Sequence, residues 1–147
     1  MNRFLRCVCL VLAIALMLPT TALAAEQESS ASTYSAYFVT YDSYLWKTSS
    51  TGFEVWFDVC ARDIMLELGA SSIIVQRSYD GTTWTSMREY TPDKYPQMLC
   101  ENTGSHGDCV LYYNGLPGYY YRAYVTFYAK KSSGYGKVFL YTQPMQL

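Results

Sequence analysis

The chain has 147 residues, of which 50% are hydrophobic, a formal net charge of −1 and a single histidine. This length is enough for one domain with its own hydrophobic core. The charge is almost balanced and no stripe of lysine and arginine is present, which argues against nucleic acid or an anionic membrane as a partner.

The first 24 residues have the features of a signal peptide for export. Arg3 and Arg6 give a positive start, an apolar run follows from Cys7 to Leu18, and small residues lead to Ala24. The apolar run corresponds to about 18 Å of helix, whereas a bilayer core is about 30 Å thick. We therefore expect the signal to be removed, which leaves a secreted protein without a membrane-inserted segment.

The rest of the chain is predicted to be a short leader followed by one domain. Residues 25–33 are small, polar and acidic, a composition typical of a disordered segment. Residues 34–147 contain all 16 tyrosines, mixed with valine, phenylalanine, tryptophan and threonine. Aromatic and β-branched residues pack well on a pleated surface, so this composition favours strands.

The first part of the domain predicts two strands and a short helical segment. A strand is predicted over residues 37–46. Residues 53–61 predict a half-buried strand, because alternate positions are apolar: Phe53, Val55, Phe57, Val59 and Ala61. Residues 63–70 predict one or two helical turns, because Asp63 can cap a helix and Gly69 can end it.

Residues 71–90 predict a β-hairpin. Two strand-like runs flank Asp80 and Gly81, a pair that favours tight turns with positive φ. With a turn of two residues, Arg77 lies opposite Trp84, where the two side chains could form a cation–π pair.

The last part of the domain predicts an irregular connection and three more strands. Residues 91–108 contain two prolines and two glycines and are expected to be irregular. Strands are predicted over residues 109–113, 119–129 and 137–142. The chain then has seven short strands and no long helical pattern, which predicts an all-β fold, an antiparallel sandwich of two sheets.

Three cysteines lie in the domain: Cys60, Cys100 and Cys109. Outside the cell a bridge from Cys100 to Cys109 would close the glycine-rich loop 101–108 and contribute about 2.5–3 kcal/mol. The alternative is three free thiols. Cys60 is then either a buried strand cysteine or a partner for one of the other two.

Two stretches resemble parts of fibronectin-III and related immunoglobulin-like domains. Residues 112–125 (YYNGLPGYYYRAYV) are similar to the passage from the fifth to the sixth strand, and residues 76–87 are similar to the middle hairpin. The resemblance implies a tyrosine corner, in which the phenol of Tyr121 closes back on the loop backbone, with Tyr119 and Tyr120 as alternatives. Nearly the whole exported chain is similar to small uncharacterised secreted proteins of Gram-positive bacteria. This resemblance implies export and a β-sandwich fold, and it identifies no catalytic residue.

No pattern in the sequence predicts catalysis or a cofactor. A nucleophile–base pair of His106 with Cys100 or Cys109 is less expected than an ordinary polar loop. His106 and the three cysteines lack the spacing that is usual for zinc ligands. The aspartates are scattered and form no calcium-binding loop. No pair of acidic residues stands out as the catalytic pair of a glycosidase. We therefore expect no enzyme, no metal site and no cofactor.

The excess of tyrosine suggests a binding surface instead. If alternate residues of the strand 119–129 face the core, the outer face carries an aromatic and basic row: Tyr120, Arg122, Tyr124 and Tyr128. Such a row fits a flat protein or glycan surface. The alternative is a face that only favours strand formation or that the leader covers. The Asp80–Gly81 tip and the 101–108 loop are further candidate contacts.

The sequence therefore predicts a secreted, non-enzymatic binding or adhesion module with an unknown protein or glycan ligand. A self-associating component of the cell envelope or matrix is the alternative, paired through an edge strand such as 137–142. A small secreted hydrolase is a remote third hypothesis, which requires a pocket with converging acids or His106.

Overall fold

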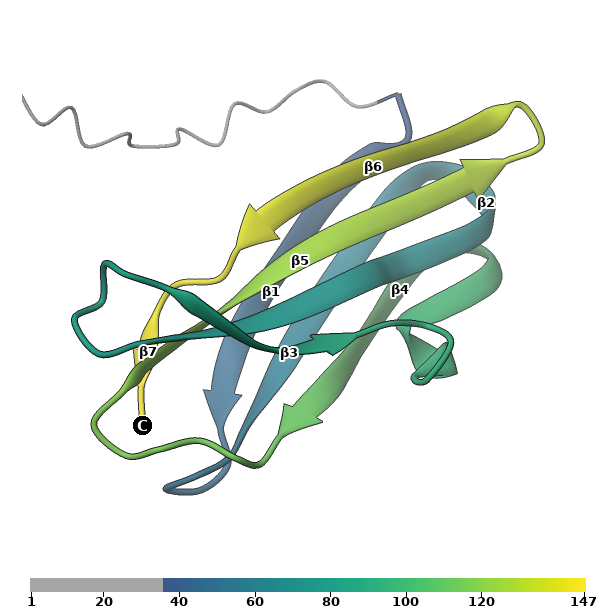
Figure 1. The fold of residues 1–147 in the computed structure, drawn as a ribbon. Coiled ribbons are helices and arrows are strands. Elements are labelled where there is room, and N and C mark those ends of the chain that lie inside the picture. Colours follow the sequence, from purple (N-terminus) through teal and green to yellow (C-terminus); the bar gives the residue numbers. More distant parts are fainter. Residues whose placement is uncertain (1–35) are drawn as a thin grey trace, which may run out of the picture. The chain divides into compact units, whose positions relative to one another are not determined.

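The computed structural model describes residues 36–147, so the predicted signal peptide and leader lie outside the described residues. Residues 36–147 are all-β, with seven antiparallel strands in one curled sheet and one short 3₁₀ turn, η1 (Figure 1). The expected division into two separate sheets is not confirmed. The elements are β1 (Phe38–Lys47), β2 (Phe53–Ser78), β3 (Thr85–Tyr90), η1 (Pro96–Met98), β4 (Leu99–Tyr112), β5 (Tyr120–Lys131), β6 (Gly134–Tyr141) and β7 (Met145–Gln146).

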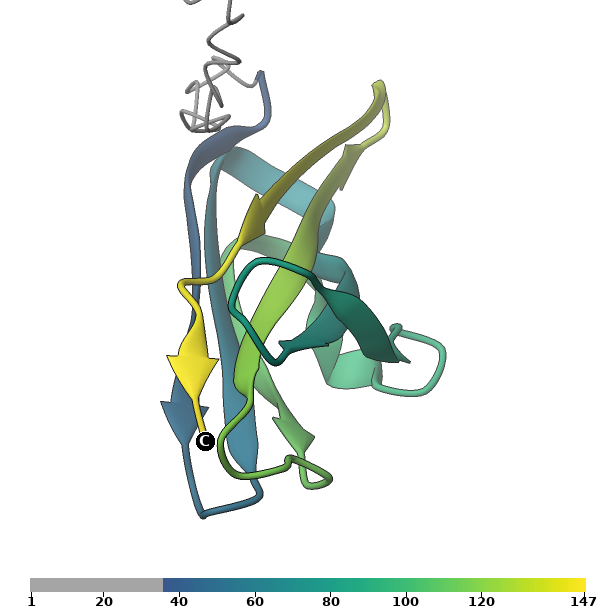
Figure 2. The ribbon, with the colours of Figure 1, turned by 60° about the vertical axis from the view of Figure 1, so that its left-hand side comes forward.

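β2 is 26 residues long and has a neighbour on each side along most of its length. Residues 53–60 lie between β1 and β4. Residues 67–69 lie between β4 and β5, and residues 73–77 lie between β3 and β5. β2 therefore belongs to a first half of the sheet, with β1 and β4, and to a second half, with β3, β5 and β6. Figure 2 shows the two halves facing each other.

β2 changes course at residues 61–64. Cys60 pairs with Ser105, whereas Met65 pairs with Thr103, so residues 61–64 lie opposite Gly104 alone. Extra residues on one strand of a pair bend that strand and increase its twist. The bulge therefore turns β2 from the first half of the sheet into the second.

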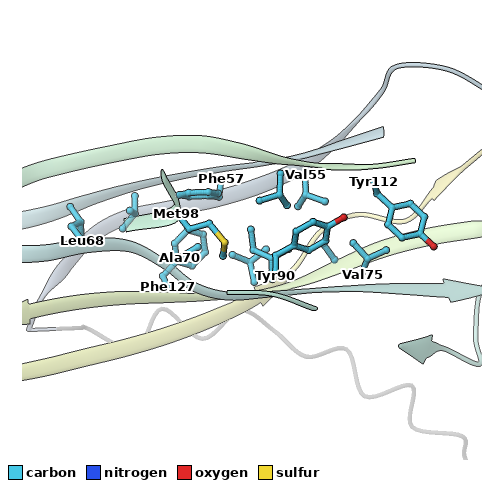
Figure 3. Packing of buried hydrophobic residues seen from close by; sticks show 14 of the residues in the cluster. Val55, Phe57, Leu68, Ala70, Val75, Tyr90, Met98, Tyr112 and Phe127 are labelled. Atoms are coloured by element: carbon cyan, nitrogen blue, oxygen red, sulfur yellow. The ribbon is translucent and has the colours of Figure 1, made fainter. Parts of the chain in front are cut away.

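Aromatic rings from both halves of the sheet meet in the core. The ring centroids of Phe57 and Phe127 are 6.5 Å apart, and those of Phe53 and Tyr121 are 5.2 Å apart. Figure 3 shows Phe57 and Phe127 on facing strands. Residues 53–61 and 120–129 alternate between buried inner positions and more exposed outer ones, as the sequence predicted. The outer faces of the two halves therefore point away from each other.

Tyr90 joins β3 to the opposite half. Its ring is fully buried, and its hydroxyl donates a hydrogen bond of 2.9 Å to the carbonyl of Leu111 in β4. Burial raises the pKa of Tyr90 to about 12, so the phenol stays neutral and keeps the proton that it donates.

The edge strands β1 and β6 approach each other at one end of the sheet. Tyr37, just before β1, packs over β6: a Cβ on Gly136 would lie 2.5 Å from Cδ2 of Tyr37, and one on Gly134 would lie 3.2 Å from its hydroxyl. A ring that covers glycine on an edge strand shields backbone that has no side chain of its own. Tyr37 therefore helps to close the curled sheet.

Three local predictions are wrong. Residues 63–70 are strand instead of helical turns, because β4 and β5 pair with this part of β2. Residues 101–108 are the middle of β4 instead of a loop. The two-residue turn at Asp80 and Gly81 is a longer loop, residues 79–84, so that Arg77 pairs with Thr85. Gly81 does have the expected positive φ, +75°.

Gly69 gives a direct test of the close packing around the centre of β2. Its φ is +152°, and a Cβ at this position would overlap the carbonyl oxygen of Met98. We expect Gly69→Ala to lower the free energy of unfolding by about 3 kcal/mol, because the backbone has to shift. In the control Gly104→Ala, the nearest contact of the new Cβ is the Asp63 carbonyl oxygen at 3.8 Å, and we expect a loss below about 1 kcal/mol. Urea unfolding measures both, and equal losses would contradict this packing.

Candidate functional site

The outer face of β5 carries the row that the sequence predicted. Four side chains of this row are partly exposed: Tyr120, Arg122, Tyr124 and Tyr128. The positions that alternate with this face of β5 are buried: Tyr121, Ala123, Val125, Phe127 and Ala129. The alternation places the row on the outside of the second half of the sheet.

β6 extends this row with more aromatic side chains. Tyr141 pairs directly with Tyr124, and their ring centroids are 4.8 Å apart. Phe139 lies diagonally opposite, with its centroid 5.4 Å from that of Tyr124. The side chains of Phe139 and Tyr141 are 59% and 38% exposed, so β6 adds open aromatic surface to the row.

Arg122 links this aromatic group to the loop before β3. Its guanidinium carbon lies 4.3 Å from the ring centroid of Trp84 and 4.1 Å from that of Tyr141. Its Nε donates a hydrogen bond of 2.8 Å to Oε1 of Gln76. A flat cation against two rings is a favourable contact that also fixes the side chains. The linked residues form what we call the aromatic strip: Trp84, Arg122, Tyr124, Phe139 and Tyr141.

The other two tyrosines of the predicted row lie outside the strip. Tyr128 contacts Tyr135 of β6, with centroids 5.8 Å apart, and Nζ of Lys137 lies 5.8 Å from its ring. Tyr120 lies at the start of β5, where it pairs with Ser78 and β7. The predicted row of tyrosines is therefore divided, and only Tyr124 and Arg122 belong to the continuous group.

Sequence reasoning missed three members of the strip: Trp84, Phe139 and Tyr141. The sequence does indicate Phe139 and Tyr141, because residues 137–142 (KVFLYT) alternate with the same period of two as β5. Trp84 was expected to meet Arg77. The longer loop instead places Arg77 over the ring of Tyr119, 4.9 Å from its centroid.

Two loops next to this half of the sheet are fixed by hydrogen bonds. The hydroxyl of Tyr121 accepts a bond of 2.7 Å from the amide of Leu116, which is the closure onto the loop that the sequence suggested. The carboxylate of Asp80 accepts bonds of 2.8 Å from the amides of Thr83 and Thr82. These hydrogen bonds stabilise the charged carboxylate, and the bond from Thr83 has the largest effect. They hold the pKa of Asp80 well below its ordinary value. The turn at Asp80 is therefore held in one conformation by hydrogen bonds to its own side chain.

The predicted disulfide between Cys100 and Cys109 is wrong. Both lie on β4, and nine residues of extended strand separate their Cα atoms by about 30 Å. A disulfide requires Cα atoms within about 7 Å. Both cysteines and Cys60 are free and partly exposed in the structure. Burial raises the pKa of the Cys109 thiol, helped by the nearby Glu54 and Asp108, which favours the protonated form.

The first half of the sheet carries a second aromatic group on its own outer face. Tyr44 of β1 pairs with Trp56 of β2, and their rings are nearly parallel at 6°, with centroids 6.3 Å apart. The indole Nε1 of Trp56 donates a hydrogen bond of 2.7 Å to the carboxylate of Glu54. We call the residues of this group and the acids beside them the acidic face: Asp42, Tyr44, Trp46, Glu54, Trp56 and Asp58.

A shallow hollow of about 370 Å³ adjoins the acidic face, lined by Thr40, Asp58, Val59, Cys60, Ser105, His106 and Gly107. A cysteine and a histidine in one hollow raise the question of a nucleophile and its base. However, His106 pairs with Val59, an inward position, whereas Cys60 pairs with Ser105 on the outer face. Nε2 of His106 lies 2.8 Å from the Gln97 carbonyl, and its ring packs against the edge of Phe57. Cys60 and His106 therefore lie on opposite faces and form no nucleophile–base pair.

In comparisons with known proteins, no protein-family model, curated protein or solved structure matches the chain. Within residues 36–147, no group of three or more histidine, cysteine, aspartate or glutamate side chains could hold a metal ion. The same part of the chain has no helix of the length and apolar character that crossing a membrane requires. The site is therefore interpreted from its own geometry.

Arg122 tests whether the strip is a connected unit. We expect Arg122→Gln to lower the free energy of unfolding by about 1–2 kcal/mol, because the cation between Trp84 and Tyr141 is lost. Arg122→Lys should recover less than half of this loss, because an ammonium group cannot lie flat against two rings.

The matched control for Arg122→Gln is Lys137→Gln, which removes a more distant cation from Tyr128. Its expected loss is below about 0.5 kcal/mol. Urea unfolding of the three variants measures the difference. The same loss for Arg122→Gln and Lys137→Gln would contradict the contacts described for Arg122.

Proposed function

We propose that the protein is a secreted, non-enzymatic binding module whose ligand lies on the aromatic strip. The observation that carries the proposal is a continuous line of contacts from Trp84 through Arg122 to the exposed rings of β6. Secretion is inferred from the signal-like N-terminus of the sequence. The facing halves of the sheet and the Tyr121 closure support our further proposal of a fold related to the immunoglobulin and fibronectin-III sandwiches.

The exposed rings favour binding over a purely structural role. Phe139 and Tyr141 of β6 are 59% and 38% exposed, although the apolar faces of their rings gain nothing from contact with water. Neighbouring exposed rings on a folded protein commonly mark an interaction surface. Tryptophan, tyrosine and arginine are also the residues that contribute most to binding free energy at interfaces.

The strip is held in its shape before a ligand arrives. Tyr124 and Tyr141 lie on paired strands, and Gln76 of β2 fixes the guanidinium of Arg122. Little side-chain freedom is left to lose on binding, so more of the contact free energy contributes to affinity. The strip therefore has the order that a binding surface needs.

The shape of the strip favours an extended ligand. Its rings lie on a sheet face, whereas the hollow described above lies on the other half of the sheet. Small molecules usually bind in concave sites that enclose them. A flat aromatic surface with one cation instead fits a glycan chain, whose sugar rings stack on aromatic faces, or the surface of a protein.

A glycan array and a panel of extracellular proteins test the proposal. We expect the double variant Phe139→Ala/Tyr141→Ala to bind its ligand at least about tenfold more weakly than the wild type. The fold should persist, because both side chains are exposed on an edge strand.

The control variant is Tyr79→Ala/Tyr113→Ala, which removes two rings that are 78% and 63% exposed and lie outside the strip. We expect its affinity to stay within about twofold of the wild type. Unchanged affinity in the Phe139→Ala/Tyr141→Ala variant would show that the ligand binds elsewhere. A wild-type protein that binds nothing on either the array or the panel would contradict the proposal as a whole.

A further inference from the structure

The two outer faces of the sheet carry different charge. The acidic face contains three carboxylates, from Asp42, Glu54 and Asp58, and no basic residue. Next to the aromatic strip the other face carries Arg122 and Lys137 against Glu89. Farther along the same face Lys130 lies with Glu67 and Glu101, so the face as a whole has as many acids as bases. One face is therefore acidic, whereas the other is balanced as a whole and has the cation of Arg122 within its aromatic strip.

Two of the three carboxylates of the acidic face lie opposite each other, and none of the three forms an ion pair within residues 36–147. Asp42 and Asp58 are direct partners in the pairing of β1 and β2, and like charges in such positions destabilise a sheet. The ion pairs formed within residues 36–147 join Lys130 to Glu67 and Lys131 to Asp63. Neither pair involves the acidic face, so a positive partner would relieve a repulsion that the single chain retains.

Both faces also expose aromatic rings of similar extent. On the acidic face Tyr44 and Trp46 are 46% and 61% exposed, and on the strip Tyr141 and Phe139 are 38% and 59% exposed. Rings at both surfaces would be removed from water if the two faces met, and Arg122 would come near the carboxylates.

We propose that the acidic face of one copy binds the aromatic strip of a second copy, so that copies join head to tail. The proposal rests on the proposed function, because it names a second copy of this chain as a partner of the same strip. The two faces lie on opposite sides of the core, so each contact uses a different surface on either copy. A contact of this kind leaves one face open at each end and repeats along a chain of copies.

The size of the faces predicts weak association. A contact that extends beyond the named residues over the whole outer side of each half of the sheet, three strands about 4.8 Å apart and ten residues of about 3.3 Å each, covers roughly 400–500 Å² on one partner. The total buried area of about 1,000 Å² lies at the low end for specific contacts. We therefore expect micromolar or weaker affinity, which falls as salt screens the charges.

Mixing two variants tests the head-to-tail arrangement. Asp42→Lys/Asp58→Lys disables the acidic face and keeps the strip, whereas Phe139→Ala/Tyr141→Ala disables the strip and keeps the acidic face. In sedimentation velocity we expect the wild type to form oligomers with rising concentration and each variant alone to be monomeric. An equimolar mixture should form a complex that stops at two copies, because only one intact pair of faces remains.

The control for charge reversal is Asp93→Lys, which changes one exposed acid between β3 and η1, outside both faces, and is compared with the single variant Asp42→Lys. We expect this control to associate like the wild type. Should Asp42→Lys/Asp58→Lys fail to fold, Asp42→Asn/Asp58→Asn removes the charge without reversal and should still weaken association by about tenfold.

Three results would overturn the proposal. The first is a wild type that is monomeric up to about 0.5 mM, well above the affinity expected for this area. The second is a mixture of the two variants that stays monomeric while the wild type associates. The third is association that Asp42→Lys/Asp58→Lys leaves unchanged, which would instead indicate pairing through an edge strand such as β6.

The external ligand separates this proposal from the proposed function. If both hold, Asp42→Lys/Asp58→Lys loses self-association and keeps ligand binding, whereas Phe139→Ala/Tyr141→Ala loses both. A mixture that forms the two-copy complex supports the head-to-tail contact even if the array and the panel reveal no ligand. In that case only the binding of an external ligand is refuted.

Discussion

Backbone pairing on both sides of β2 holds the other strands in place. Residues 53–60, 67–69 and 73–77 each have two neighbouring strands, and together they reach β1, β3, β4 and β5. A strand of 26 residues is far longer than usual, and the bulge at residues 61–64 lets it bend. One hydrogen-bonded sheet therefore folds over itself and encloses an aromatic core.

The same strand sets the positions of both outer surfaces. Trp56 lies in its first part and belongs to the acidic face, whereas Gln76 lies in its second part and holds Arg122 of the aromatic strip. Because β2 is bent between these two residues, the two surfaces face away from each other. The binding that we propose at the strip and the self-association that we propose through both faces therefore depend on one structural feature, the course of β2.

The sequence predicted the elements whose burial is decided locally. Residues 53–61 and 120–129 alternate because one side of each faces the core, and this is visible in the order of the residues. Residues 63–70 and 101–108 could not be predicted in this way, since glycines and exposed Ile64 and Leu66 obscure the period and only pairing with distant strands makes these segments extended. The expected number of strands, seven, agrees only because β2 merges two predicted strands and β7 is added. In the same way, Arg122 and Tyr124 were found from β5 alone, whereas Trp84 and Tyr141 depend on the length of the 79–84 loop and the pairing of β5 with β6.

Amide hydrogen exchange of residues 67–69 and 99–101, followed by NMR, tests the course of β2 most directly. These stretches pair with each other, and residues 67–69 also pair with β5, so their amides should exchange about a thousandfold or more slowly than in an unfolded chain. Exchange at the rate of an open loop would contradict a continuous central strand. The placement of both outer faces would then be wrong as well.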